Sequence, residues 1–467
     1  MDIKKHILPA IIMVLLAGLI VSCEDLLHTE PTTAASSERI IESAEGMDAV
    51  LTSTYDRLRS EYLYRYWIPG GAAVLADNSE LHPINSGRFD GQAENAFGSH
   101  FSSGLWSTAY RLINEANIII DGADQTETTQ AHRDRLKGEA HFMRAMAYQE
   151  MLRVYSYEPN HPKHSDWSEG VIMRTEPTLG LSRADRRPRG TVLEGYQLIE
   201  SDYLAAISLL DGNDRGSVYF AGKAAAHAGL ARLYLYWERW DDALNHAGQA
   251  LSNAQGQLVD YGEYDNIFDM LPNPESIFEL SFDVFHGSSS SMNAVTHPPP
   301  GWFDALPSAE LLALYDEEDL RNKLFAVHDD GYPYILKYTG TVGSNTDHLP
   351  VFRVAEMILI QAEAHYEMNN EAAAIEALET LRSHRGLDAY AQAPSGAALL
   401  DEILDERSRE LAFEGHRWFD LKRRAMDVPK PAVNLNPPVP YDDVRILAPL
   451  SSTQVENNEY LNQNPGY

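Results

Sequence analysis

The feature that most constrains the fold is a regular spacing of small and bulky residues within the segment 217–254. The residues on this spacing are Leu230, Ala231, Tyr234, Ala243 and Ala250. Small side chains allow two antiparallel helices to approach closely, while Leu and Tyr fill the groove between them. The tripeptide that begins at Trp240 marks the turn. The segment is therefore predicted to be a pair of packed antiparallel helices.

The same spacing, which is that of the tetratricopeptide repeat, recurs elsewhere in the chain. A looser copy contains Ala362 and Ala374, and a half-copy contains Ala145 and Tyr148. The partner helix of the half-copy is predicted to be displaced to 191–211. Fewer than three clean repeats do not form a stable solenoid, so these units should pack against the rest of the chain.

Long stretches without helical periodicity separate the repeat-like units. Loops of this length in a compact protein are usually functional, so 60–104 and 255–350 are predicted to be ligand loops. Further helices are expected at 40–58, 105–121 and 132–155, and prolines predict a loop at 156–190. The predicted fold class is mostly α, with tetratricopeptide-like helical pairs around 131–254 and 353–386 forming a scaffold with long irregular loop regions.

The N-terminus carries the pattern of a secretory signal. Lys4 and Lys5 precede an apolar run of about 15 residues, which is shorter than the roughly 20 needed to span a bilayer. The run ends at Cys23, the only cysteine, and the site resembles a bacterial lipoprotein signal in which this cysteine is lipidated. The alternative is a short membrane anchor with an incidental cysteine. The predicted organisation is a signal peptide at 1–22, a lipidated tether at 23–38 and a single domain at 39–467.

Charge argues against one class of partner. The 467 residues contain 37 Lys and Arg against 69 Asp and Glu, which gives a formal net charge of −32. Such a chain repels a phosphate backbone, so we expect no nucleic-acid partner. The only basic cluster, Arg183 to Arg189, is short. A local arginine pocket could still bind an acidic polysaccharide despite the overall charge.

A charged string near the C-terminus, RSRELAFEGHRWFDLKR at 407–423, is interpreted as having a structural role. If it forms one helix, opposite charges meet at Glu406–Arg409, Arg407–Glu410, Glu414–Arg417 and Asp420–Arg424. The residues of its apolar stripe would be Ile403, Leu404, Leu411, Trp418 and Leu421. The carboxylates could suggest a glycoside hydrolase, but neighbouring arginines oppose the raised pKa that its general acid needs.

Motifs of catalysis and of metal binding are not found in the sequence. It contains no G-x-S-x-G, H-E-x-x-H or phosphate-loop motif. The acidic run Asp316 to Asp319 lacks the alternating oxygen ligands of a calcium loop and is interpreted as an exposed turn. We therefore expect no catalytic residue, no cofactor and no metal site.

Three strings together resemble one known family. They are RVAEMILIQAEAHYEMNNEAAAIEALETLRSHRG at 353–386, RELAFEGHRWFDL at 409–421 and the terminal LNQNPGY. With Cys23 and the repeat-like pairs, the chain resembles the SusD/RagB family of outer-membrane nutrient-binding lipoproteins. The resemblance implies a surface-exposed, lipid-anchored protein that captures an oligosaccharide or polysaccharide and passes it to a TonB-dependent SusC-like transporter. Glu24 and Asp25 resemble the acidic signal for export to the cell surface.

Sugars stack their C–H faces on aromatic rings and bond their hydroxyl groups to polar side chains. The candidate ligand-binding residues are Tyr64, Trp67, Asn78, Trp302 and Phe303. Tyr62, Tyr64 and Tyr66 alternate as on a strand face, so any of them could instead belong to the core. The alternative functions are a tetratricopeptide-type surface lipoprotein that binds proteins or peptides and, more remotely, a glycoside hydrolase.

Overall fold

The computed structural model describes residues 42–98, 100–101, 104–180, 185–283, 290–341, 343, 345–434 and 437–467. Its α-helices are α3 (Ala44–Leu58), α4 (Trp67–Leu75), α5 (Asp90–Ala93), α6 (Gly104–Gly122), α7 (Gln130–Tyr155), α8 (Val192–Leu210), α9 (Lys223–Trp237), α10 (Trp240–Asn253), α11 (Met292–Thr296), α12 (Ala309–Leu312), α13 (Val354–Glu367), α14 (Glu371–His384), α15 (Ala397–Glu410), α16 (Arg417–Arg423) and α17 (Ser452–Asn457). The strands are β1 (Ser79–Leu81), β2 (Ser276–Leu280), β3 (Ala305–Pro307), β4 (Phe325–Val327), β5 (Pro333–Ile335) and β6 (Leu349–Arg353). The prediction of a mostly helical fold is confirmed.

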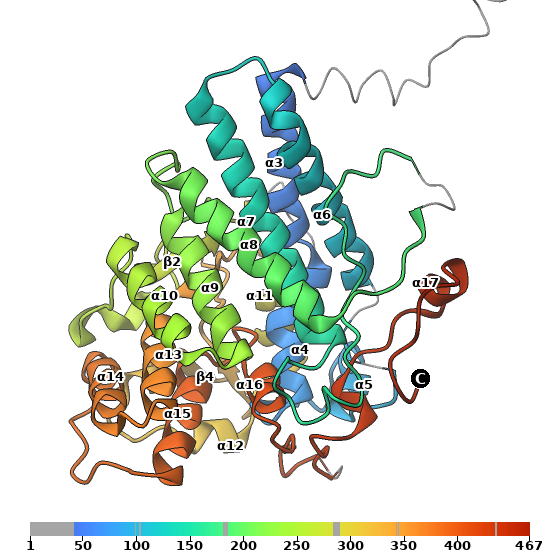
Figure 1. The fold of residues 1–467 in the computed structure, drawn as a ribbon. Helices are drawn as coiled ribbons and strands as arrows, with labels where there is room; N and C mark the ends of the chain where they lie inside the picture. The colour runs from blue at the N-terminus through green and yellow to red at the C-terminus, as the bar shows by residue number, and fades with distance from the viewer. Residues whose placement is uncertain are drawn as a thin grey trace, which may run out of the picture.

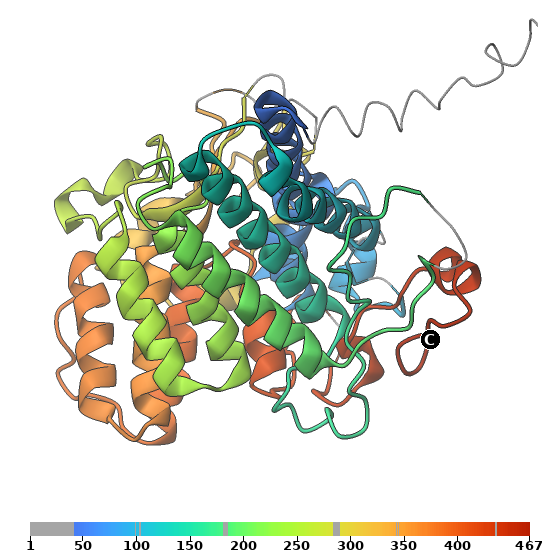
Figure 2. The same ribbon diagram turned by 45° about the horizontal axis from the view of Figure 1, so that its top comes forward.

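The long helices form one continuous array. Successive neighbours pack in the order α3, α6, α7, α8, α9, α10, α13 and α14, as the views in Figures 1 and 2 show. The pairs α9–α10 and α13–α14 are the predicted repeat-like units. The half-copy in α7 packs against α8, as predicted. The helix α8 is displaced along the sequence, since it begins only after the long loop that follows Tyr155. The array is therefore built from local helix pairs joined into a single core.

Small residues do allow close helix approach in this array. An added Cβ at Gly229 of α9 would lie 2.4 Å from the ring of Tyr203 in α8, so only glycine fits there. Tyr203 is fully buried and donates its hydroxyl to Gln149 of α7 at 2.7 Å. The α7–α8–α9 contact is thus fixed both by packing and by a buried hydrogen bond.

The structure corrects the interpretation of 60–104 as loop. This segment contains α4, in which every residue from Ile68 to Leu75 is buried. A helix that is buried on all sides has no polar face and hence no amphipathic period to detect. Pro69 lies in its first turn, where the missing N–H costs no intrahelical bond.

The segment 407–423 does not form one continuous helix, so the condition on which its charge pairs were derived does not hold. The helix α15 ends at Glu410 and α16 begins at Arg417, with Phe413 and Gly415 between them at φ values of 60° and 87°. Only the Glu406–Arg409 pair forms as predicted, at 2.7 Å. The other charged residues of the string pair across elements, because buried charges need more compensation than neighbours on one helix supply. The predicted apolar stripe, in contrast, is entirely buried.

The chain's last residues are held against the body of the protein. The side-chain amide of Asn464 donates to the carbonyl groups of Tyr155 and Ala448 at 2.9 and 2.7 Å. Its oxygen accepts from Arg189 and Trp167 at 2.8 and 3.1 Å. The LNQNPGY string therefore ties the end of α7 to the end of the chain.

The signal peptide, the tether and Cys23 lie outside the described residues. Within the part of the chain that the structure describes, no helix combines the length and apolar character needed to cross a membrane.

Candidate functional site

The two long blocks that were predicted to hold the ligand meet one another. The strand β1, from the first block, pairs antiparallel with β3, from the second, in the register Ser79–Pro307 to Leu81–Ala305. Immediately beyond the paired strands, the backbone N–H of His82 donates to the carbonyl of Asp304 at 3.0 Å. Segments more than 200 residues apart in the sequence thus form a single surface.

Two of the candidate rings join one aromatic cluster at this junction. Trp67, in the first turn of α4, packs edge-on against Phe89 with ring centroids 5.2 Å apart. Tyr66 lies between the two candidates, 5.4 Å from Trp67 and 6.5 Å from Trp302. Trp67 and Trp302 are only partly buried, whereas Tyr66 and Phe89 are buried. The buried rings therefore support the two partly exposed indoles.

An arginine covers one face of Trp302. The guanidinium carbon of Arg88 lies 3.3 Å from the centroid of the Trp302 ring, which is a close cation–π contact. Arg88 also pairs with the buried carboxylate of Asp304 at 3.1 Å. The same carboxylate accepts from the backbone N–H and the hydroxyl of Ser86, at 2.6 and 2.8 Å. Asp304 therefore holds the loop 82–89 against Trp302.

A second group of rings begins at the next residue, Phe303. Its φ of 54° is rare for a residue with a side chain, and such strain is concentrated at functional sites. The turn separates its ring from that of Trp302, and Phe303 stacks on His82 with centroids 4.7 Å apart. Tyr332 meets His82 edge-on at 4.7 Å, and Tyr334 meets Phe303 at 6.2 Å. The hairpin of β4 and β5 thereby adds two partly buried tyrosines to the surface.

The remaining candidates lie in the interior. Tyr64 is 3% exposed and donates its hydroxyl to Glu150 at 2.8 Å, so the alternative assignment to the core applies to it. Asn78 is 3% exposed and accepts from the hydroxyl of Ser408 at 2.8 Å. Phe303 is 3% exposed and supports His82 from beneath. Tyr64 therefore belongs to the core, whereas Asn78 and Phe303 support the surface from within.

Sequence analysis missed His82, Arg88, Tyr332 and Tyr334. Each is a single residue in a turn or a short strand, and none belongs to a periodic pattern. The block 255–350 was identified correctly as a source of rings, and the alternation of Tyr332 and Tyr334 around Pro333 was the available signal.

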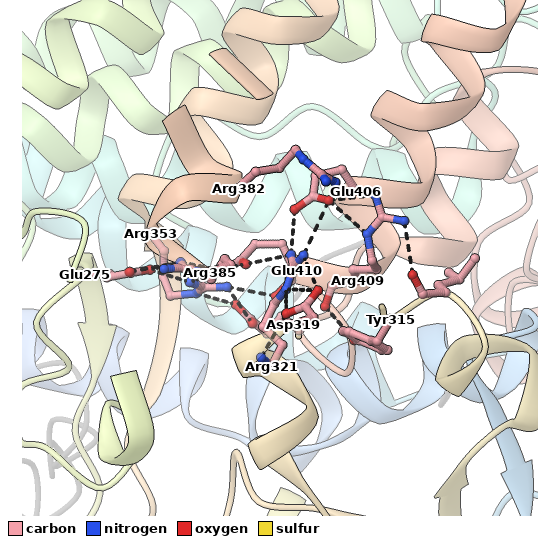
Figure 3. A network of polar contacts seen from close by, with 12 residues as sticks. Glu275, Tyr315, Asp319, Arg321, Arg353, Arg382, Arg385, Glu406, Arg409 and Glu410 are labelled. Carbon is pink, nitrogen blue, oxygen red and sulfur yellow. Dashed lines mark hydrogen bonds and ion pairs between the residues drawn. The ribbon is translucent and has the colours of Figure 1, made fainter. Parts of the chain in front are cut away.

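The C-terminal string forms a buried ionic network beside this surface, which Figure 3 shows from close by. Glu410 lies at its centre and bonds Arg353, Arg385 and Arg321 at 2.9, 2.9 and 3.2 Å. Glu275 bonds both Arg353 and Arg385 at 2.9 Å. The remaining contacts join Arg321 to Asp319 and Glu406, Arg409 to Glu406, and Arg353 to Glu414.

This network corrects one interpretation and bears on another. Asp319 is 2% exposed and paired with Arg321, so the acidic run does not end as an exposed turn. Burial alone would raise the pKa of Glu410, but the charges of Arg385 and Arg353 outweigh it and hold that pKa well below its usual value. Likewise, Arg321 and Arg409 overcome burial and lower the pKa of Glu406 to about 2. A general acid for glycoside hydrolysis needs the opposite shift.

The string also anchors the chain that leads into the aromatic surface. Arg417 makes a bidentate pair with Asp77 at 2.7 and 2.8 Å, and Ser408 bonds Asn78. The hydroxyl of Ser308 donates to the carbonyl of Asp77, and the backbone N–H of Ser308 donates to the carbonyl of Asn78 at 3.2 Å. Residues 77–78 therefore lie between the C-terminal string and β3.

The fold and the ring cluster define a helical-repeat protein with an aromatic surface built on loops. Residues 25–235 match the family model described as starch-binding associating with outer membrane, and residues 328–467 match the model of the SusD family. The chain belongs to the SusD/RagB family, which associates with the outer membrane and binds carbohydrate.

Individual relatives are distant but extend over most of the chain. SusD-like protein P2 of Formosa agariphila is 25% identical, over 99% of this chain and 100% of that protein. A SusD-like protein of Bacteroides ovatus is 23% identical, over 81% of this chain and 75% of its own.

Solved structures share the fold. A putative sugar binding protein from Bacteroides vulgatus superposes with a TM-score of 0.81 and 23% identity, over 91% of this chain and 99% of that one. A SusD superfamily protein from Bacteroides thetaiotaomicron has the same TM-score and identity, over 91% of this chain and 100% of its own.

Proposed function

We propose that this protein is a cell-surface lipoprotein that captures an oligosaccharide or polysaccharide on the surface formed by Trp302, Tyr332, Tyr334 and Arg88. It is anchored in the outer membrane through Cys23 and delivers the glycan to a TonB-dependent SusC-like transporter. It acts without catalysis, cofactor or metal. The carbohydrate-binding family to which the chain belongs supports the substrate class.

The observation that carries the proposal is the convergence of partly exposed rings from two distant blocks. Trp302 presents an indole whose position is held by Arg88 and Tyr66. Tyr332 packs against His82 and Tyr334 packs against Phe303, so two phenol rings join the same surface. Flat rings bind the C–H faces of sugars, and Arg88 can donate to their hydroxyl groups. Because buried neighbours hold the rings in place, little side-chain entropy is lost when a glycan binds.

Retardation in native gels that contain soluble polysaccharides tests the glycan-binding step. The mature chain, starting after Cys23, should be retarded by at least one neutral polymer. Trp302→Ala should raise the dissociation constant roughly 30-fold, because a central aromatic anchor contributes about 2 kcal/mol to binding. Tyr261→Ala is the matched control, since this ring is 65% exposed and outside the surface.

The outcomes separate the alternatives. If the glycan retards Trp302→Ala as strongly as the wild type, the ring surface is not the glycan-binding site. No retardation by any polymer, together with binding of peptides, would favour the tetratricopeptide-type function. Copurification of a TonB-dependent transporter with the lipidated full-length protein, and its loss in Cys23→Ser, would test the delivery and anchoring steps.

A further inference from the structure

A second candidate site is a cavity that lies away from the ring surface. It has a volume of about 900 Å³ and is bordered by α6, by described residues of 172–180 and 185–186, and by the region around α17. Figures 1 and 2 show the described parts of the chain between α7 and α8 standing off the helical array on the side of α17. The volume falls in the range of small-molecule sites, which is about 300–1,000 Å³.

The inner wall of the cavity offers a fixed aromatic ring. Tyr110 of α6 is partly buried and packs against Trp106 with centroids 5.1 Å apart. Its hydroxyl donates to the carbonyl of Ile172 at 2.9 Å, which holds the ring in place. Leu461, near the end of the chain, contributes apolar area to the same cavity. A sugar ring could therefore stack here without ordering a mobile side chain.

The charges around the cavity differ from those of the whole chain. Three arginines line it, Arg111, Arg174 and Arg186, against two carboxylates. Of these carboxylates, Glu115 is already paired with Arg57 at 3.0 Å, and Asp185 also has a partner. Within the described residues, the side chains of Arg111, which is exposed, and Arg186, which is partly buried, have no ion pair and no hydrogen bond. A chain of net charge −32 thus keeps two unpaired guanidinium groups at this cavity.

We propose that this cavity is a second glycan site, which binds the carboxylate or sulfate groups of an acidic oligosaccharide through Arg111 and Arg186. Guanidinium groups bind such anions through paired, charge-assisted hydrogen bonds, and a cleft with low-dielectric walls strengthens their field. This inference rests on the proposed glycan-binding function but concerns a site separate from Trp302. Arg186 belongs to the short basic cluster of the sequence, Arg183 to Arg189, and the proposal gives this residue a role in binding anions.

Calorimetric titration with two trisaccharides of equal length tests the site. Trigalacturonate carries three carboxylates, and maltotriose is neutral. The mature chain should bind trigalacturonate, and Arg111→Gln and Arg186→Gln should each raise its Kd about tenfold, since each removes a charge-assisted contact. Arg239→Gln removes the same charge outside the cavity and should leave the Kd unchanged. Raising the ionic strength from about 0.1 to about 1 M should also weaken binding.

Comparison with the ring surface decides between sites. Trigalacturonate binding that is unchanged in Trp302→Ala but weakened in both arginine variants supports the inference. Loss of binding in Trp302→Ala with normal binding in the arginine variants would overturn it and leave the proposed function intact. Absence of trigalacturonate binding, or equal binding of maltotriose at the cavity, would also overturn it. Retardation by neutral polymers reports separately on the proposed function, and circular dichroism confirms that each variant is folded.

Discussion

The replacement Glu410→Gln should destabilise the protein strongly while leaving its shape and glycan binding unchanged. The change removes one charge and adds no volume. The carboxylate of Glu410 is 1% exposed and bonds three guanidinium groups, from Arg353, Arg385 and Arg321. Glutamine keeps one acceptor oxygen but turns an amide donor toward a guanidinium donor.

The size of the effect follows from what remains around the arginines. Removing one partner of a buried ion pair costs about 3–5 kcal/mol. Glu275 still bonds Arg353 and Arg385, and Glu406 still bonds Arg321, so the lower end of that range applies. A loss of about 3 kcal/mol is a large part of the 5–15 kcal/mol that stabilises a typical protein.

Urea unfolding followed by tryptophan fluorescence measures this loss. The transition midpoint should fall with an unchanged slope, because the surface exposed on unfolding is the same. Glu376→Gln is the matched control, since Glu376 is exposed on α14 and its replacement should change the free energy of unfolding by less than about 0.5 kcal/mol.

Acid dependence provides a second readout. A carboxylate whose folded-state pKa is lowered contributes stability above its unfolded pKa and loses it as the pH falls. Glu406, with a pKa of about 2 against an ordinary 4.5, should lose its contribution between about pH 4.5 and 2, and Glu410 should behave in the same direction. Glu410→Gln should therefore flatten the acid limb. A variant as stable as the wild type, with the same acid limb, would refute the reasoning that the network depends on this charge.

Three further predictions concern other parts of the fold. Burial raises the pKa of Asp347 to about 6, and its Oδ2 has no hydrogen-bond partner among the described residues. The neutral carboxyl group of Asp347 contributes fully to the free energy of unfolding below pH 3.8, and this contribution is lost as the pH rises through 6. In urea titrations, Asp347→Asn should therefore stabilise the protein by up to about 3 kcal/mol at pH 7 and should not stabilise it below pH 3.8. Gly229→Ala should cost about 1–3 kcal/mol in thermal unfolding, because its Cβ would overlap the ring of Tyr203; an unchanged melting temperature would contradict this. Arg417→Lys loses the bidentate pair with Asp77, so retardation by glycan should weaken while the helical circular dichroism is retained.

The helical array could be predicted because its signals are local. The helices α3, α6 and α7 begin and end within four residues of their predicted bounds, and the residues of the repeat spacing identify α9–α10 and α13–α14 as pairs. The pairing of α7 with α8 followed from the half-copy at Ala145 and Tyr148. These features repeat every three or four residues, so a single sequence is enough to detect them.

Elements without local periodicity could not be predicted. The helix α4 is buried on all sides, and the break between α15 and α16 arises from charges that pair across the fold, such as Arg417 with Asp77. In the site, Trp67 and Trp302 were among the candidate ligand-binding residues, and they do share a cluster through Tyr66. The rest of the cluster depends on the β1–β3 pairing, which has no signature in either strand.

The position of Asn464 has a consequence for the order of folding. This side chain satisfies the carbonyl groups of Tyr155 and Ala448 and the guanidinium of Arg189, and its contacts with Tyr155 and Arg189 span 309 and 275 residues of the sequence. Contacts between residues so far apart form slowly, because the intervening chain must first lose conformational entropy. We therefore expect the end of α7 and the loop that carries Arg189 to gain these bonds only after the helical array between them and Asn464 has folded.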